Sequence, residues 1–531
     1  MSTAPAEAAI SGGDLVDRLV NMLGAEHVLA DEADRRFYST DVFSHTSLPA
    51  AVVRPDTLEE IQAVVRLCAS AGLPVVVRGG GASYTDGYLH VREGGITIDT
   101  VRFDRIVEIN ENNATVTVEA GCSWAKLHEA LSARGLRTPF WGPFSGLVAT
   151  VGGSMSQHAI SHGTGAHGIS AESVLSFDIV TGTGELLRTG SAGSEKSRSF
   201  FRFYGPDLTG LFTGDCGALG IKAHITLPLI RRHEAFEAAS FSFDSFEALH
   251  RAMRQIAIEG VDDENFGLDA ALQQGQIGRQ EGMSAKAEIA KSVMKSASSI
   301  GSGVKQLAKM AAAGDRALRA ANYVAHYIVD GVDAADARAK VKVIQRIGSE
   351  HGTEIANSVP TVVRGMPFAP LTNTLGPKGE RWVPLHGLFA HDAVAGFHQA
   401  LTDYWSETEE ERERLGIYTG AMFMGVGSNA FVYEPTFYWP DERTIYHERV
   451  VPQDHLANVT RFDGNETARH AVKRMKSRIV DLMHEHGAAH FQVGKVYPYL
   501  RGRNAPSVSL LRAIKAELDP ENILNPGALG L

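Results

Sequence analysis

The stretch Val75-Val-Val-Arg-Gly-Gly-Gly-Ala-Ser-Tyr-Thr-Asp-Gly87 decides the fold of this chain. Its β-branched run predicts a buried strand that leads directly into three consecutive glycines. Because glycine has no Cβ and accepts positive φ, successive backbone N–H groups in such a turn can close around a phosphate. Glycine-rich turns also arise for purely steric reasons, so this stretch alone does not separate a phosphate site from an ordinary turn.

A second glycine-rich stretch, Thr150-Val-Gly-Gly-Ser-Met-Ser-Gln-His158, is followed by a third, His162-Gly-Thr-Gly-Ala-His-Gly168. The first of these two predicts a short helix, whose N-terminus favours negative charge. Two such bends suit a long diphosphate ligand, although two tight turns in a sheet-rich domain would have the same composition. Neither matches a G-x-G-x-x-G motif that follows a strand at the start of a βαβ unit, so we expect no nicotinamide-binding Rossmann fold.

The composition indicates a globular protein of more than one domain. The chain has 531 residues, 44% hydrophobic and 21% charged, with a formal net charge of −11. This balance argues against nucleic acid as a partner, which would require a basic surplus. The chain shows no secretory signal pattern and no apolar run that could span a bilayer. Its three widely spaced cysteines form neither a metal motif nor a disulfide framework, so we expect a cytoplasmic protein.

Hydrophobic periodicity divides the chain into regions of different character. Residues from about 50 to 230 predict short mixed strands and helices of an α+β unit, whereas the region from about 235 predicts an α/β unit on an antiparallel sheet. We place the boundaries at 1–234, 235–465 and 466–531. Residues 284–329, rich in Ala and Lys, predict a helical insertion. A basic amphipathic helix can contact a membrane, but a solvated helix covering the second domain is the simpler explanation.

The order of these motifs resembles the flavoprotein family of vanillyl-alcohol oxidase and p-cresol methylhydroxylase, which includes D-lactate dehydrogenases and glycolate-oxidase-like proteins. Each matching stretch is weak alone, and their shared order makes the resemblance specific. They cover about 180 N-terminal residues and the C-terminal tail, at positions 54–57, 78–84, 117–121, 151–154, 205–214, 217–221 and 519–527.

This resemblance implies an FAD-binding domain of two subdomains, of the p-cresol methylhydroxylase type, with a substrate (cap) domain at 235–465 and a C-terminal segment that returns to the first domain. It implies that residues 79–83 hold the FAD diphosphate, that 152–153 and 162–168 wrap the ribityl and isoalloxazine side, and that 174 and 221 lie along the adenine. The cofactor-binding residues expected on this basis are Arg78, Gly79, Gly80, Gly81, Ala82, Ser83, Tyr84, Gly152, Gly153, Ser156, His162, Gly165, Gly168, Val174, Gly220, Ile221, Lys495 and Asn525. Relatives that attach flavin through this glycine loop carry His where this chain has Ala82, so we expect FAD bound non-covalently. The alternative is a link from elsewhere, for which Cys216 and the other histidines are available.

The substrate side is indicated by stretches rich in aromatics, Pro and Arg at 360–370, 379–387 and 433–441. Oxidation of an alcohol needs a base for the hydroxyl proton and groups that hold the rest of the substrate. A His or Tyr in an aromatic stretch is more often part of a hydrogen-bonded core. The candidates are His386 and His490 as bases, Tyr433 and Tyr438 behind them, and Arg364 or Arg381 as a carboxylate clamp.

Two departures from the family pattern bear on the substrate. His391 and His398 have the spacing of the metal-binding run in D-lactate dehydrogenases of this family, but the Gly-Asp-Gly-Asn between them is missing, so we expect no metal. Phenol oxidases of the family hold a phenolate with a Tyr-Arg pair, where this chain has Phe491 and Gln492, with Lys495 nearby to replace part of that charge. Both an aromatic alcohol and a 2-hydroxy acid therefore stay open.

The sequence thus predicts an FAD-dependent oxidoreductase that removes hydride from a CH–OH group to flavin N5. Electrons would pass to oxygen, a quinone or a redox protein, and the family resemblance implies a homodimer. Two alternatives keep the fold: a non-redox flavin enzyme of the alkyldihydroxyacetonephosphate synthase type, and a catalytically silent flavin-binding protein. The first requires a phosphate pocket, and no dense Lys/Arg cluster lies near Arg364 and Arg381.

Overall fold

The structure is a computed structural model that describes residues 12–279 and 321–531. Its first layer is a four-stranded sheet in the order β1 (Val28–Leu29), β2 (Ala51–Val53), β4 (Ile96–Asp99) and β3 (Val75–Arg78). Strands β2 and β3 both run parallel to β4. Helix α3 (Leu58–Ala71) packs its apolar face on this sheet, starts at the Thr57 cap and ends at the left-handed Gly72. Other elements of this subdomain are α1 (Gly12–Leu23), η1 (Ala25–His27), α2 (Glu32–Tyr38) and η2 (Thr100–Arg102).

The second subdomain is a five-stranded antiparallel sheet in the order β5 (Ile106–Asn110), β6 (Thr115–Glu119), β10 (Ile221–Pro228), β8 (Ser176–Val180) and β9 (Leu186–Arg188). A separate short pair joins β7 (Leu136–Arg137) to β11 (Ile230–Arg231). The helices of this subdomain are α4 (Trp124–Ser132), α5 (Val151–Gln157), α6 (Thr164–His167), α7 (Leu208–Leu211), η3 (Ser170–Ser173) and η4 (Gly190–Gly193).

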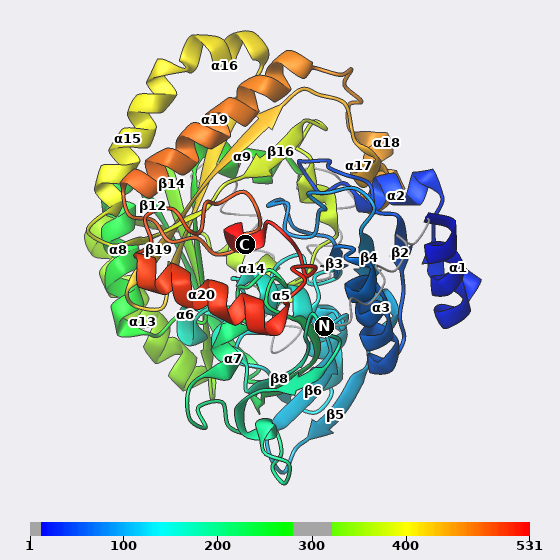
Figure 1. Cartoon of the computed structure of the whole chain (residues 1–531). Helices are drawn as coiled ribbons and strands as arrows, with labels where there is room; N and C mark the ends of the chain where they lie inside the picture. The colour runs from blue at the N-terminus through cyan, green and yellow to red at the C-terminus, as the bar shows by residue number, and fades with distance from the viewer. Residues whose placement is uncertain (1–11, 280–320) are drawn as a thin grey trace.

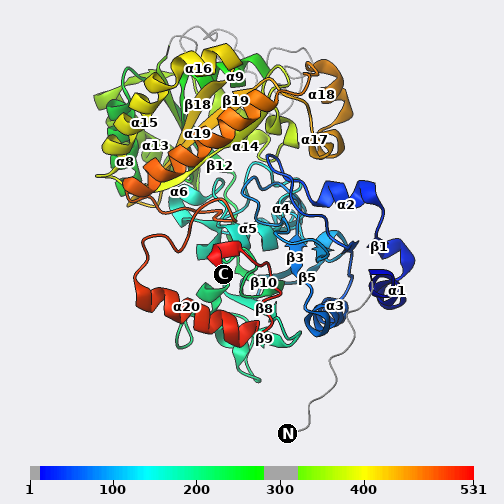
Figure 2. The ribbon, with the colours of Figure 1, turned by 45° about the horizontal axis from the view of Figure 1, so that its top comes forward.

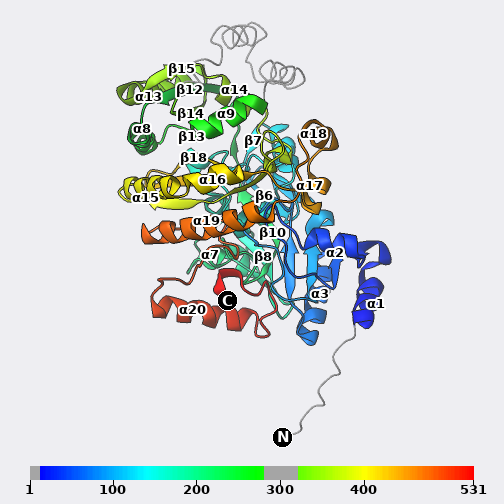
Figure 3. The same ribbon diagram turned by 90° about the horizontal axis from the view of Figure 1, so that it is seen from above.

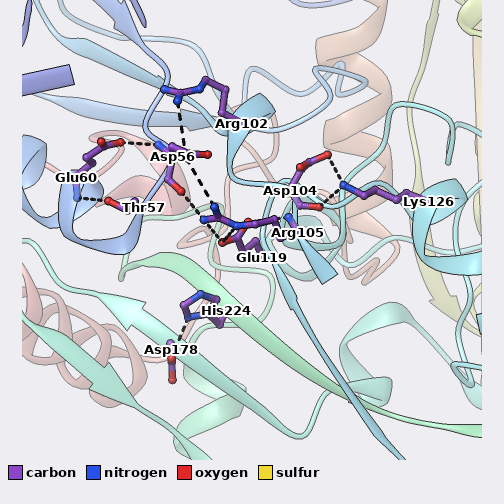
Figure 4. A network of polar contacts seen from close by, with 10 residues as sticks. All are labelled: Asp56, Thr57, Glu60, Arg102, Asp104, Arg105, Glu119, Lys126, Asp178 and His224. Atoms are coloured by element: carbon purple, nitrogen blue, oxygen red, sulfur yellow. Dashed lines mark hydrogen bonds and ion pairs between the residues drawn. The ribbon is translucent and has the colours of Figure 1, made fainter. Parts of the chain in front are cut away.

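A buried carboxylate joins the two subdomains (Figure 4). The Arg105 guanidinium donates to Glu119 at 2.7 and 2.9 Å and to the backbone carbonyl of Asp56, just before α3, at 2.5 Å. Glu119 at the end of β6 is only 2% exposed, so this pairing compensates for its desolvation. In the neighbouring Lys126–Asp104 pair the carboxylate is 39% exposed.

The cap domain is built on an eight-stranded sheet in which every pairing is antiparallel. Its strand order is β15 (Thr353–Ile355), β12 (Ala235–Phe243), β14 (Tyr323–Gly331), β13 (Glu264–Asp269), β18 (Tyr418–Val426), β19 (Ala430–Trp439) and β16 (Arg381–Pro384), with β17 (Gly387–Ala390) also paired to β19. One face is covered by α8 (Phe246–Glu259), α13 (Ala334–His351), α15 (Val394–Glu407) and α19 (Glu466–Glu485), which share one hydrophobic core with it (Figures 1 and 2). The opposite face is directed toward the N-terminal domain. The remaining helices here are α9 (Ala270–Arg279), α14 (Ser358–Gly365), η5 (Leu371–Thr374), α16 (Glu409–Leu415), α17 (Ile445–Val450) and α18 (Gln453–Asn458).

The C-terminal segment returns to the first sheet, where the C-terminus lies close to β10 in Figure 2. After α20 (Ala505–Leu518), Leu524 forms a parallel bridge with Val75. The Val75 N–H donates to the carbonyl of Ile523 and the Asn525 N–H donates to the carbonyl of Val75, each at 2.8 Å. The chain therefore ends, at η6 (Ala528–Gly530), beside the strand that leads into the glycine turn.

One expected element is corrected by the structure. Most of the helical insertion expected at 284–329 lies outside the described residues, but its last part is strand, because β14 begins at Tyr323. This strand pairs with β12 on one side and β13 on the other, and its β-branched and aromatic run is buried on both faces. The helix at 323–329 was therefore wrong. Among the described helices, none is long and apolar enough to cross a membrane.

Candidate functional site

A cavity of about 310 Å³ opens where the two N-terminal subdomains meet the cap sheet. Backbone of the glycine turn after β3 and of the start of α5 forms much of the wall on the N-terminal side. Side chains from the cap sheet and from the C-terminal segment close the other end. The residues on the N-terminal side include Gly79, Gly80, Gly81, Ala82, Ser83, Gly152, Gly153, Gly220 and Ile221.

The glycines at this wall are required because neighbouring backbone and side-chain atoms approach them too closely for a Cβ. A Cβ on Gly80 would lie 1.7 Å from the carbonyl oxygen of Val148, and one on Gly79 would lie 2.4 Å from Thr150 Oγ1. A Cβ on Gly152 would lie 2.6 Å from that of Ala120. This part of the wall therefore consists of main chain with few side chains. Such a wall fits the diphosphate of a dinucleotide, which backbone N–H groups can bind.

Hydroxyl groups from both domains hold the glycine turn. Gly81 has a φ of 68°, and its carbonyl accepts hydrogen bonds from Tyr88 at 2.9 Å and from Tyr446 of α17 at 2.8 Å. The Arg78 guanidinium lies 4.2 Å from the ring centre of Phe37 and fills the space that a side chain on Gly81 would need. Arg78 thus packs against the turn on the side away from the cavity and does not line it.

The register of the cap sheet decides which side chains reach the cavity. Met422 of β18 lies directly opposite Glu434 of β19, and Met424 lies two residues further along the same face. Their neighbours in sequence, including Phe423 and Tyr433, point into the core under the helices. Met422, Met424 and Glu434 accordingly line the cavity.

The cap end of the cavity is mostly apolar. It is completed by Trp382 of β16, by Phe491 and Gln492 of the C-terminal segment, and by Tyr84 of the glycine turn. Tyr84 packs edge-on against Trp382, and burial together with the nearby Glu434 raises the pKa of its hydroxyl well above its usual value. Burial raises the pKa of the Glu434 carboxyl to about 8.

Of the expected cofactor-binding residues, eleven line the cavity: Gly79, Gly80, Gly81, Ala82, Ser83, Tyr84, Gly152, Gly153, Ser156, Gly220 and Ile221. The other seven do not line the cavity, and their roles toward the cofactor stay predictions. Lys495 Nζ donates to Asn525 Oδ1 at 2.6 Å, and Asn525 donates in turn to the Gly87 carbonyl at 2.8 Å, so this pair holds the far end of the turn. Burial lowers the pKa of Lys495 to about 8.

His162 lies at the domain contact, with Nε2 2.6 Å from the carbonyl of Pro367 and Nδ1 2.8 Å from Glu264. A Cβ on Gly165 would lie 2.5 Å from Asp262, so this glycine lets the loop approach the cap sheet. Val174 belongs to the core of the second subdomain. Gly168 ends α6 with a φ of 73°.

None of the expected catalytic residues lines the cavity. His386 is fully buried, stacks on Phe491 at 4.0 Å, and has its pKa lowered well below the usual value by burial. His490 donates from Nδ1 to the His386 carbonyl at 2.9 Å, and burial lowers its pKa. Tyr438 stacks on Tyr418 at 4.7 Å. These roles stay predictions, and the structure offers Glu434 as an ionisable group that does line the cavity.

Both expected carboxylate clamps are engaged elsewhere. Arg364 forms an ion pair with Asp330 at 2.7 Å. Arg381 donates to the carbonyls of Val42 and Phe43 at 3.2 and 3.1 Å, and burial lowers its pKa to about 10. The two histidines with metal-like spacing do not converge either, because His391 contacts His250 and His398 contacts the Tyr433 hydroxyl.

Glu434 was missed from the sequence, although a signal was present. It is the one acid in the run Ala430-Phe-Val-Tyr-Glu-Pro-Thr-Phe-Tyr-Trp439, which reads as a buried strand. A carboxylate inside such a strand is costly unless it serves a purpose. His386 and His490 were predicted as bases from their residue type, whereas strand register decides which side chains reach the site.

Two family models match the chain. The model described as FAD binding domain matches residues 49–190, and the model described as FAD linked oxidases, C-terminal domain matches residues 398–529. The glycolate oxidase subunit GlcD of Bacillus subtilis is 27% identical over 244 residues, which cover 46% of this chain and 50% of that protein. The chain thus spans about half the length of the curated relatives it matches.

Two solved structures share the fold over nearly the whole chain. p-Cresol methylhydroxylase with bound substrate has a TM-score of 0.71 at 17% identity, covering 98% of this chain and 96% of that one. Alkyldihydroxyacetonephosphate synthase has a TM-score of 0.67 at 14% identity, covering 97% of this chain and 84% of that one. At such identities the likeness concerns the fold alone. With the glycine-walled cavity and both family models in agreement, the chain belongs to the FAD-linked oxidases, its fold is like that of p-cresol methylhydroxylase, and its cofactor is FAD.

Proposed function

We propose that the protein is an FAD-dependent oxidoreductase that oxidises the CH–OH group of a neutral, largely apolar organic alcohol, with Glu434 as the base. The observation that carries this proposal is a single cavity. It joins the glycine turn at Gly79–Ala82 to an apolar recess whose one carboxyl group, among the described lining residues, is that of Glu434. The first part fits the diphosphate of FAD, and the second has the composition of a small-molecule site.

The cavity wall holds the parts of the substrate in different ways. Trp382, Met422, Met424 and Phe491 offer an apolar surface to the body of the substrate. Gln492 and the hydroxyl of Tyr84 supply polar atoms beside it. When bound, FAD supplies the acceptor for the hydride that leaves the substrate carbon. The Glu434 carboxylate takes up the hydroxyl proton, so that the carbon–oxygen bond can become a carbonyl.

A neutral substrate follows from the charges at the site. Among the described residues that line the cavity, Lys222 is the one cation, and its ammonium is paired with Asp215 at 2.5 Å. A carboxylate or phosphate would enter without a counter-ion and would lie near Glu434. We therefore favour an aromatic or other apolar alcohol over a 2-hydroxy acid, and over the phosphate-bearing substrate of a non-redox enzyme.

Anaerobic bleaching of the flavin tests the proposal. We expect benzylic alcohols to bleach the 450 nm band, whereas glycolate and D-lactate leave it unchanged. Glu434→Gln, which preserves size and removes the base, should keep the yellow colour and lose about 10²- to 10⁴-fold in the bleaching rate. Bleaching by the hydroxy acids alone would move the assignment to them, and a flavin that no alcohol bleaches would favour a non-redox or silent protein. Reoxidation by oxygen or by a soluble quinone then identifies the class of acceptor.

A further inference from the structure

The mouth of the cavity lies at η5. Of the described residues that line the cavity, only Asn373 of η5 is exposed. Its neighbours Leu371 and Thr374 also line the cavity, and they are buried, with 4% and 3% of their surface exposed. A substrate that enters by this mouth therefore passes η5 on its way to the apolar recess.

This helix belongs to a segment that reaches from the cap to the N-terminal domain. The segment, residues 366–374, which we call the strap, follows α14. Helix α14 packs against β12 and β14 on the cap face that is turned toward the N-terminal domain (Figures 2 and 3). Among the described residues, the hydrogen bonds of the strap across this boundary come from Pro367 and Ala369. The Pro367 carbonyl lies 2.6 Å from His162 Nε2, and the Ala369 N–H donates to the Phe144 carbonyl at 2.9 Å.

Between these two bonds, Phe368 places its ring in a socket of the N-terminal domain. The ring is edge-on to His162 and Trp141, with ring centres 5.7 and 6.0 Å away. Gly142 and Gly146 make room for it, because a Cβ on these residues would lie 2.9 and 2.4 Å, respectively, from the Phe368 ring. The socket therefore exists because two side chains are missing, and the ring that fills it attaches the strap.

Beyond this ring, the strap packs on the N-terminal domain through Leu371, in a small apolar cluster with Val42. Ala369 and Pro370 between them are exposed. Within η5, the hydroxyl of Thr374 donates to the Leu371 carbonyl at 2.7 Å, a bond that moves with the segment. A segment with so few buried contacts opens locally at low cost, and lids over active sites are drawn from such segments.

We propose that the strap is the gate of the substrate site, and that Phe368 is a positioning residue whose ring holds this gate closed. Closure places η5 against the cavity, and release of the ring opens the mouth. The loop that forms the socket continues to Val148, whose carbonyl oxygen packs against Gly80. The closed strap thus has a fixed place relative to the glycine turn. The identity of what passes the gate rests on the proposed function, whereas the gate itself does not.

Labelling of a thiol inside the cavity measures the opening of the gate. Met424→Cys provides the thiol, because Met424 lines the cavity and is 3% exposed. The probe is methyl methanethiolsulfonate, a small neutral reagent, applied to the FAD-loaded protein, with peptide mass spectrometry as the readout. Phe368→Ala removes the ring and Gly146→Ala fills the socket, so each should raise the labelling rate by about tenfold or more. Phe241→Leu, in the cap core away from the strap, is the control and should leave the rate unchanged.

The double variant Phe368→Ala/Gly146→Ala separates loss of the gate from general destabilisation. Without the ring, a Cβ at position 146 no longer meets it, so the double variant should label no faster than Phe368→Ala alone. Unchanged labelling in both single variants, rates that multiply in the double variant, or an equal increase in Phe241→Leu would overturn the gate. None of these readouts needs turnover. If labelling behaves as expected and no alcohol bleaches the flavin, the gate holds and the proposed oxidation fails.

Discussion

At the scale of single residues, burial favours the protonated form of Glu434, whereas its proposed role as a base needs the ionised form. Its carboxyl group is buried among Met422, Trp382 and Phe491, and that burial raises its pKa to about 8. The proton is therefore held at neutral pH, while the proposed role as a base requires the ionised form. The same residue should consequently limit both the pH range of activity and the stability of the fold.

The pH profile of turnover follows from this pKa. Below about pH 8 the ionised fraction of Glu434 increases tenfold per unit, so kcat/KM for a neutral alcohol should rise in proportion and level off above pH 8. Glu434→Gln should give a low and nearly flat profile. Steady-state rates from pH 6 to 10 provide the measurement, and a wild-type profile without this slope would remove Glu434 from the mechanism.

Stability should depend on pH in the opposite sense. Between the unfolded pKa of 4.5 and the folded value of about 8, the unfolded chain releases a proton that the native state keeps. This contribution to the free energy of unfolding is present below pH 4.5 and is lost as the pH rises toward 8. Glu434→Gln should therefore raise that free energy by roughly 4 kcal/mol at pH 8 and by less than about 1 kcal/mol at pH 5. Thermal melts at the two pH values would measure the difference, and equal effects at both would contradict it.

Gly80 should tolerate no side chain, because a Cβ would lie 1.7 Å from the carbonyl oxygen of Val148. Backbone on both sides must then shift, at about 1–3 kcal/mol or more, and the turn loses its shape. We expect Gly80→Ala to purify without yellow colour. Gly13→Ala, where nothing lies within 4 Å, should retain the full flavin absorbance. A yellow Gly80→Ala protein would show that the turn is not needed for FAD.

At the scale of elements, strand register determines which side chains line the cavity, and residue type alone does not predict it. The glycine clusters were readable from the sequence because their function depends on the absence of side chains. Glu434 and Met422 were not, because their position at the cavity depends on a pairing across β18 and β19. The strand at Tyr323 was mistaken for helix since a strand buried on both faces loses the period-two pattern.

The link between the two N-terminal subdomains offers a test at this scale. Arg105→Met leaves the buried Glu119 with a backbone N–H donor but without its half-exposed cation, and should lower the free energy of unfolding by about 1–3 kcal/mol. Arg105→Met combined with Glu119→Gln should recover part of that loss. Lys126→Met breaks the exposed pair with Asp104 beside it and should cost less than about 1 kcal/mol. Denaturant titrations of the wild type and the three variants give the free energies of unfolding. Equal losses for Arg105→Met and Lys126→Met would refute the argument.

At the scale of the whole molecule, one buried ion pair joins the N-terminal domain to the cap, and a second, next to it, lies within the cap. Arg137 donates to Asp263 at 2.6 Å across the domain contact, and Asp330, paired with Arg364, lies 3.8 Å from Arg137. Together with the Tyr446 hydrogen bond to the glycine turn, they connect the cofactor side of the cavity to its substrate side. The overall division into these parts was accessible from motif order, whereas these cross-domain pairs join residues too distant in sequence to be foreseen.

The cofactor should be held without a covalent bond. Among the described residues no histidine lines the cavity, and burial raises the pKa of the Cys216 thiol there to about 12, so it is a poor nucleophile. Acid precipitation should release the flavin into the supernatant. Free FAD at 100 times its dissociation constant should then stabilise the refolded protein by about 2.7 kcal/mol. Yellow colour retained in the pellet would establish a covalent link.

The return of the chain end to β3 has a consequence for biosynthesis. Val75 lies early in the sequence, yet its backbone partners are residues 523–525. Asn525 and Lys495 then fix the far side of the glycine turn. While those residues are still inside the ribosome, the nascent turn lacks the groups that complete it. Flavin loading therefore requires residues 523–525 to have been synthesised and released, and a ribosome stalled before position 523 would carry a colourless chain.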